Sequence, residues 1–271
     1  FCGVLRVLML FVAAVVVIAI LLGKNPMTLF AGLGATSAVL MLVFKDTITG
    51  LAAGVRLTSN DMLHKGDWIT VKSVDANGIV EDMSLTTVKV RNFDNTIVTI
   101  SPTTLVNGSF QNWIGMQKSG GRRVKRVVYF DFRSVRLVDE TLKCTLLARH
   151  FATEDSFKLK ESLQKAIDKD IQEGKDIEDL KNPAALAPTN LQLYRKFMEK
   201  YLRQRPEVNT DLTLMVRHME ATQCGLPIEF YFFIKDKVWV NYEHILADIM
   251  EHAYALANEF GLKIYEQYPE Q

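Results

Sequence analysis

Apolar residues dominate the first 55 positions of the chain, and only four charged residues interrupt them: Arg6, Lys24, Lys45 and Asp46. Residues 4–22 form a run of membrane-spanning length, because about twenty apolar residues cross a bilayer. Arg6 lies near the start of this run, where its side chain can extend to the headgroups. A signal peptide is the competing interpretation, but no small-residue cleavage site follows, so we expect a true span.

A second apolar segment follows the turn at 23–26 and is free of charge from 27 to 43. A charge at the bilayer centre costs roughly 2.5 kcal/mol or more, so we expect Lys45 and Asp46 at the far interface and a crossing helix at 27–44. Residues 47–57 then place an apolar stripe on one helical face, and this piece is too short to span. We expect it to lie along the interface or on a neighbour, after a bend at residues 45–50.

Small residues are concentrated in the first half of the second segment. In lipid, helices associate through close backbone approach at small residues, since burying apolar area against one another gains little. Small residues on several faces favour two neighbouring helices, as in a ring of copies. A seam against residues 4–22 of the same chain is the alternative. The residues concerned are Ala31, Gly32, Gly34, Ala35, Ser37 and Ala38.

Alternating apolar and polar residues between 66 and 112 predict four or five short strands. Turn signals at 76–78 and 93–95 predict hairpins, and Pro102 is expected to end the pairing. So many short strands in one stretch favour a small, strongly bent antiparallel β-barrel, resembling an Sm-like barrel, at residues 58–113.

Residues 122–271 predict an α+β domain with helices packed on a sheet. The segment at about 151–210 interrupts this order with charged, helix-forming sequence, and a solvated surface helix is the favoured interpretation over a partner-binding arm. The expected elements are a strand at 122–132, a helix at 134–150, strands at 212–220 and 228–235, a helix at 243–260 ended by Gly261, and a short final strand.

Composition narrows the function classes. The 271 residues carry a formal net charge of +1, which gives no support for a high-affinity nucleic-acid binder. Three distant cysteines offer neither a disulfide framework nor metal-ligand spacing, so we expect no metal and no cofactor. The sequence contains none of the common nucleotide-binding, hydrolase or metalloprotease motifs, and we expect no enzyme. The first residue is Phe rather than Met, so a fragment or a processed chain is expected.

Positive charge sets the expected topology. Arg56, His64 and Lys65 follow the second apolar segment closely, whereas the 23–26 connection holds only Lys24. Basic residues favour the cytoplasmic side, so the soluble part and the N-terminus are expected there.

Several motifs resemble the small-conductance mechanosensitive channel (MscS) family over nearly the whole chain, and its miniconductance-like branch most closely. They are "LGATSAV" (33–39), "LAAGV" (51–55), "KGDWITV" (65–71), "GIVEDM" (78–83), "TTVKVRNFDNTIVTISP" (86–102) and "SFQNW" (109–113). The resemblance implies seven copies around a pore lined by the second apolar helix, with a hollow cytoplasmic vestibule. It also implies further membrane helices before Phe1.

The resemblance assigns roles along the second helix. It places the sealing ring on Ala38 and Leu42, and only Leu42 matches the family in residue type. It puts the hinge glycine on Asp46, beside Lys45, so Gly50 is the expected substitute, and the family's further glycine is kept as Gly54. The helix-packing positions are Ala31, Gly34, Ala35 and Ser37, with Val39 and Met41 in place of smaller family residues.

The expected function is a channel of the bacterial inner membrane that tension opens on hypo-osmotic shock, releasing ions and small solutes. Its expected partners are further copies of itself and membrane lipids, with no nucleic acid. The alternative is a membrane-anchored module that binds RNA or a protein without a pore, and a carrier comes third.

Overall fold

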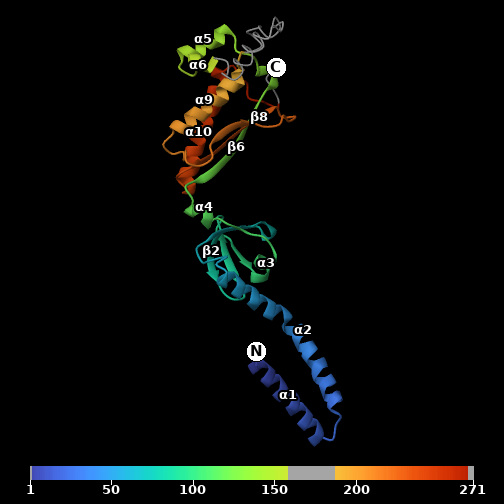
Figure 1. Cartoon of the computed structure of the whole chain (residues 1–271). Coiled ribbons are helices and arrows are strands. Elements are labelled where there is room, and N and C mark those ends of the chain that lie inside the picture. Colours follow the sequence, from blue (N-terminus) through green and yellow to red (C-terminus); the bar gives the residue numbers. More distant parts are fainter. Residues whose placement is uncertain (1, 158–186, 268–271) are drawn as a thin grey trace. The chain divides into compact units, whose positions relative to one another are not determined.

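The computed structural model describes residues 2–157 and 187–267 of the chain and divides into two compact units, 1–114 and 115–271 (Figure 1).

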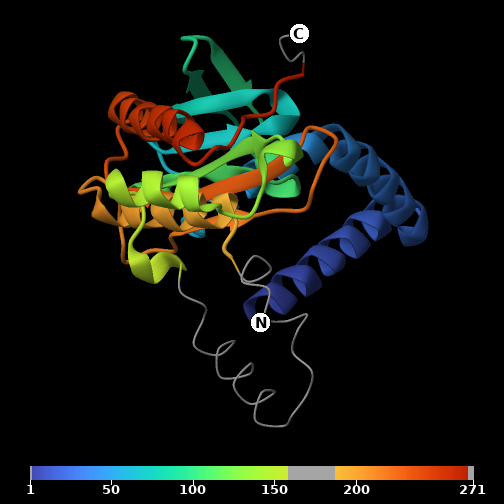
Figure 2. The same cartoon turned by 90° about the horizontal axis from the view of Figure 1, so that it is seen from above.

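The first unit begins with two long helices, α1 (Cys2–Leu21) and α2 (Pro26–Ser59). Both are long and apolar enough to cross a membrane, by length and composition. Figure 2 shows them joined by a short turn. Gly23 adopts φ +60° in this turn, and the Asn25 side chain accepts a hydrogen bond from the Met27 N–H (2.9 Å), so it caps the start of α2.

The β domain of this unit is one five-stranded antiparallel sheet in the order β4-β3-β2-β1-β5. The register between β2 and β3 shifts between Val80 and Asp82, which bends the sheet. Gly78 permits the close approach of β3, because a Cβ there would lie 1.9 Å from the Arg91 carbonyl oxygen. The strands are β1 (Trp68–Val71), β2 (Ala76–Met83), β3 (Val88–Asn92), β4 (Ile97–Ile100) and β5 (Gln111–Asn112), with a 3-10 turn at Lys72–Val74.

A small antiparallel β domain is confirmed, but the closed barrel is not shown. In residues 2–114 no ladder joins β4 to β5. The helix α3 (Pro102–Asn107) follows β4 instead, and its Leu105 is buried in the core with Leu57 from α2. Two helices therefore contribute to the core of the open sheet. The structure places the first turn earlier than the predicted position 76–78. Residues 76–78 already belong to β2, and Asp75 just before them adopts the left-handed conformation (φ 51°).

The second unit is a three-stranded antiparallel sheet in the order β6-β8-β7, with helices packed on one face. The α+β class is confirmed. Its elements are α4 (Ile114–Lys118, which begins at the boundary), β6 (Arg122–Phe130), a 3-10 turn (Phe132–Ser134), α5 (Glu140–Ala148), α6 (Glu154–Phe157), α9 (Asn190–Gln204), β7 (Met215–His218), β8 (Leu226–Ile234) and α10 (Trp239–Glu259). The predicted final strand is a single bridge between Ile264 and Phe130.

The segment predicted as a charged insertion, 151–210, is only partly a surface feature. Residues 158–186 lie outside the described residues. The helix α9, however, belongs to the core, because Tyr194, Met198 and Leu202 are fully buried against the sheet and α10. Figure 1 shows α9 and α10 running along the same side of the sheet. The expectation of a solvated helix is therefore wrong for residues 190–204.

Candidate functional site

The membrane part of α2 leaves its side chains uncovered in the single chain. Every residue from 31 to 49 is exposed, and Leu42 is 74% exposed. Ala38 and Leu42 are four residues apart, so they lie on the same side of the helix. Both are exposed in the single chain, and exposed apolar residues of this kind need lipid or other copies to cover them.

The small-residue stripe is equally open. All of the predicted packing positions are exposed, so α1 does not cover them, although Val15 and Ala19 of α1 are buried where the two helices contact one another. The structure therefore does not show α1 packed along the small residues of α2 in the same chain. The exposed positions are Ala31, Gly34, Ala35, Ser37, Val39 and Met41.

The predicted bend region is continuous helix. Residues 45–50 lie within α2, and Figure 1 draws α2 as one unbroken ribbon. The Thr49 hydroxyl donates a hydrogen bond to the Lys45 carbonyl oxygen (2.7 Å), a back-bond of the type that often bends helices. Gly50 is the half-buried glycine of this stretch, and a Cβ there would meet nothing within 4 Å. The hinge stays a prediction.

The end of α2 is anchored on the β domain. Ala53, Gly54 and Leu57 are buried, whereas the residues from 31 to 49 are exposed. Gly54 lies directly against the β2–β3 turn, because a Cβ there would be 2.2 Å from the Leu85 carbonyl oxygen. This turn is held by the Ser84 N–H, which donates to the Thr87 carbonyl (2.8 Å).

Sequence reasoning missed Leu85 as the partner of Gly54. A glycine that follows two alanines indicates that another part of the backbone comes close to the helix at this point. Nothing in the sequence, however, indicates which of the later turns is that part. The opposite face of the same helix end stays uncovered, with Ile48, Leu51 and Val55 each about half exposed. The end of α2 thus has one face committed to the β domain and one apolar face open.

The buried carboxylate of Asp67 links the segment that follows α2 to the last strand of the β domain. The Asp67 Oδ2 atom accepts hydrogen bonds from the His64 N–H (3.1 Å) and the Asn112 side-chain amide (2.8 Å). Next to it, the rings of Trp68 and Trp113 stack with centroids 4.8 Å apart. The motifs "KGDW" and "QNW" therefore meet in space, and they fix where the first strand begins and the last ends.

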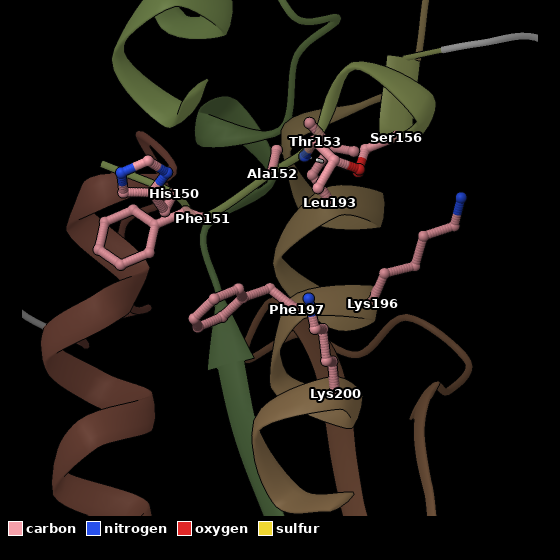
Figure 3. A pocket seen from close by; sticks show the side chains of 9 residues that line it. All are labelled: His150, Phe151, Ala152, Thr153, Ser156, Leu193, Lys196, Phe197 and Lys200. Carbon is pink, nitrogen blue, oxygen red and sulfur yellow. Dashed lines mark hydrogen bonds between the residues drawn. The ribbon is translucent and has the colours of Figure 1, made fainter. Parts of the chain in front are cut away.

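Within the described ranges, no group of three or more His, Cys, Asp or Glu side chains could hold a metal ion. A pocket of about 160 Å³ in the second unit is lined by Phe151 and Phe197, with Lys196 and Lys200 on α9 (Figure 3). Both lysines are exposed to solvent. The lining also holds His150, Thr153 and Ser156, and the two hydroxyls lie within hydrogen-bond distance of one another (3.2 Å).

Comparisons with known proteins agree on one family. Residues 46–115 match the model for "Mechanosensitive ion channel, beta-domain". The small-conductance mechanosensitive channel MscMJ of Methanocaldococcus jannaschii is 33% identical over 90 residues, which is 33% of this chain and 25% of that protein. An uncharacterized MscS family protein of Aquifex aeolicus is 31% identical over 128 residues, or 46% of this chain and 34% of that one.

Solved structures extend the likeness of fold to nearly the whole chain. The closed-state crystal structure of Helicobacter pylori MscS gives a TM-score of 0.57 at 14% identity, covering 99% of this chain and 81% of that one. The cryo-EM structure of Arabidopsis thaliana MSL1 gives a TM-score of 0.62 at 11% identity, covering 97% of this chain and 74% of that one.

The chain spans only a quarter to a third of MscMJ and of the Aquifex protein. MscMJ and the large-conductance mechanosensitive channel MscMJLR of the same organism carry channel names, which fits a protein that is not an enzyme. The miniconductance-like branch stays a prediction. The β-domain match and the repeated relatives named for the MscS family make this chain similar to that family, and the solved structures share its fold.

Proposed function

We propose that this chain is the subunit of a mechanosensitive channel in the bacterial inner membrane, which membrane tension opens on hypo-osmotic shock to release ions and small solutes. The observation that carries the proposal is the two-part character of α2. Its first part is apolar and exposed, so it needs lipid and further copies, while its end is buried in the β domain at Ala53, Gly54 and Leu57. The names of the relatives support the same activity.

The closed pore is sealed by Leu42. Copies of α2 around an axis bring their Leu42 side chains together, and a narrow apolar ring excludes water and therefore ions. Ala38 is one turn away on the same side and contributes a weaker constriction. Tension favours the state that occupies more membrane area, so it favours the wider ring.

Neighbouring copies of α2 pack through small residues. Ala31, Gly34, Ala35 and Ser37 allow close approach, and the bulkier Val39 and Met41 stiffen the sliding of one helix past another. Lys45 and Asp46 lie at the cytoplasmic headgroups. The bend forms between them and Gly50.

The assembly is a homo-oligomer of seven copies in contact with membrane lipids, and its C-terminal domains form the cytoplasmic vestibule. It requires no cofactor and no nucleic acid. The support for a ring is the uncovered small-residue stripe on α2, which α1 of the same chain leaves exposed.

The experiment combines stoichiometry with electrical recording. The purified chain in mild detergent is expected to run as a closed ring of about seven copies. Reconstituted into liposomes, it is expected to give stretch-activated currents in excised patches. A monomer without currents would contradict the channel and favour the membrane-anchored binding module.

A further inference from the structure

The three-stranded sheet of the second unit has one face without helices among the described residues. The core of this unit uses the side chains at Val124, Val128, Ile228 and Phe230 and their neighbours on the same face, with α5, α9 and α10 packed over them. Side chains alternate between the faces of a sheet, so the intervening residues lie on the other face. None of those residues belongs to the described core.

This open face, which we call the outer sheet face, combines aromatic and basic side chains. The ladders place Tyr231 between Lys125 and Met215, and Glu229 between Val127 and Arg217. Tyr231 and Phe233 form an edge-to-face ring pair with centroids 5.9 Å apart. A partly buried aromatic pair framed by cations is the composition of an interface core and rim.

Glu229 holds the cations in place. Its side chain is fully buried, its Oε2 accepts a hydrogen bond from Arg217 Nε (2.5 Å), and its Oε1 lies 3.6 Å from Lys125 Nζ. Arg217 and Lys125 nevertheless remain 48% and 54% exposed. The buried carboxylate therefore neutralises part of the charge and fixes both stems, and the face, which also carries Arg123, stays positive.

The exposed face of α10 has the opposite charge. It carries Asp248 and Glu251 beside Tyr254, and the whole helix contains no lysine or arginine. Many of its exposed positions recur at helical spacing and form one stripe, which includes Val240, His244, Ala247, Asp248, Glu251 and Tyr254.

We propose that the outer sheet face of one copy receives the exposed face of α10 from the next copy in the ring. The charges are complementary, and the lengths match. The 21 residues of α10 extend about 31 Å at 1.5 Å per residue, and the nine residues of β6 and of β8 extend about 30 Å at 3.4 Å per residue. A helix can therefore lie along the full length of the sheet.

This contact joins two different surfaces, so it repeats from copy to copy, and it forms a ring when the rotation between neighbouring copies closes. The alternative of two outer sheet faces packed on one another places Arg123, Lys125 and Arg217 of both copies together, and like charges across an interface are unfavourable. The proposed contact rests on the proposed oligomeric channel. It further specifies which surfaces of the C-terminal domain form the wall of the vestibule.

The test uses zero-length carbodiimide cross-linking of the complete chain in mild detergent, with nitrogen isotope-labelled and unlabelled copies mixed during assembly. Links between Lys125 of one isotope and Asp248 or Glu251 of the other are expected. The variant Lys125→Arg keeps the charge but gives the reagent no amine, so it should lose these links while the ring persists. Lys196, which is exposed on α9, should form no inter-copy link to α10 and is the internal control.

Two outcomes overturn different conclusions. A ring that assembles normally but shows no inter-copy link from Lys125 to α10 contradicts this contact and leaves the channel standing. Links from Lys125 to acidic residues all over the neighbour, at equal yield, would contradict the contact in the same way. A chain that does not assemble at all contradicts the proposed function itself.

Discussion

Two glycines four residues apart on α2 have different surroundings. An alanine at position 54 would place its Cβ 2.2 Å from a backbone oxygen of Leu85, and the backbone cannot turn away as a side chain could. We expect Gly54→Ala to lower the free energy of unfolding by about 1–3 kcal/mol, as overpacking does. Thermal unfolding of the detergent-solubilised chain measures this change.

Gly50→Ala is the matched control in the same helix. Its Cβ would meet nothing within 4 Å, and alanine is a better helix former than glycine by up to about 1 kcal/mol. This variant should be neutral or stabilising. Equal destabilisation by both variants would show that the contact with Leu85 is not what requires glycine at position 54.

Leu42 is the residue that we expect to keep water out of the closed pore. Leu42→Ser should hydrate the apolar ring, so channels should leak or open at lower tension, and expression should slow growth. Leu40→Ser is the control, because Leu40 faces lipid or a neighbouring helix in the proposed ring. Patch recordings that show unchanged tension for the Leu42 variant and leak for the Leu40 variant would refute the pore-facing assignment.

The single chain cannot distinguish these two leucines by burial. Leu40 is 53% exposed and Leu42 is 74% exposed, because the partners that would separate them are other copies. The sequence predicted the membrane helix from its apolar run, whereas the gate residues came only from family resemblance. A site formed between identical chains leaves no signal in the periodicity of one chain.

At the scale of elements, the alternation of apolar and polar residues predicted the strands well, whereas the charged residues misled the prediction for the helix α9. The strands β1, β3 and β4 fall inside the segments predicted from period-two patterns, whereas β2 begins at Ala76, within the predicted turn at 76–78. The helix α9 was mistaken for a surface helix because its lysines, arginines and glutamate hide a narrow apolar stripe. Leu191, Tyr194, Met198 and Leu202 follow helical spacing, and all four are buried.

The corrected role of α9 makes a stability prediction. Met198→Ala removes a fully buried side chain from the core, and substitutions of this kind cost about 2–5 kcal/mol. Lys196→Ala on the exposed side of the same helix should change stability by no more than about 0.5 kcal/mol. Denaturant unfolding compares the two, and a Met198 variant as stable as the Lys196 variant would place α9 outside the core.

At the scale of the whole molecule, the length of α2 decides where the membrane ends. Its 34 residues extend about 51 Å, whereas the hydrocarbon core is about 30 Å thick. The end that is buried in the β domain must lie in water, so the crossing uses the other end. About twenty residues from Pro26 reach Lys45, which agrees with the charge-free run that ends at position 43.

Asp46 should therefore lie at the headgroup level on the side of the β domain, which the excess of Arg56, His64 and Lys65 predicts to be cytoplasmic. In a background without the native cysteines, Asp46→Cys should react with a membrane-impermeant thiol reagent in inside-out vesicles and stay unreacted in intact spheroplasts. Thr28→Cys, near the opposite end of α2, should show the reverse. Labelling of position 46 from the periplasmic side with the pore closed would place the β domain outside the cell and overturn the proposed topology.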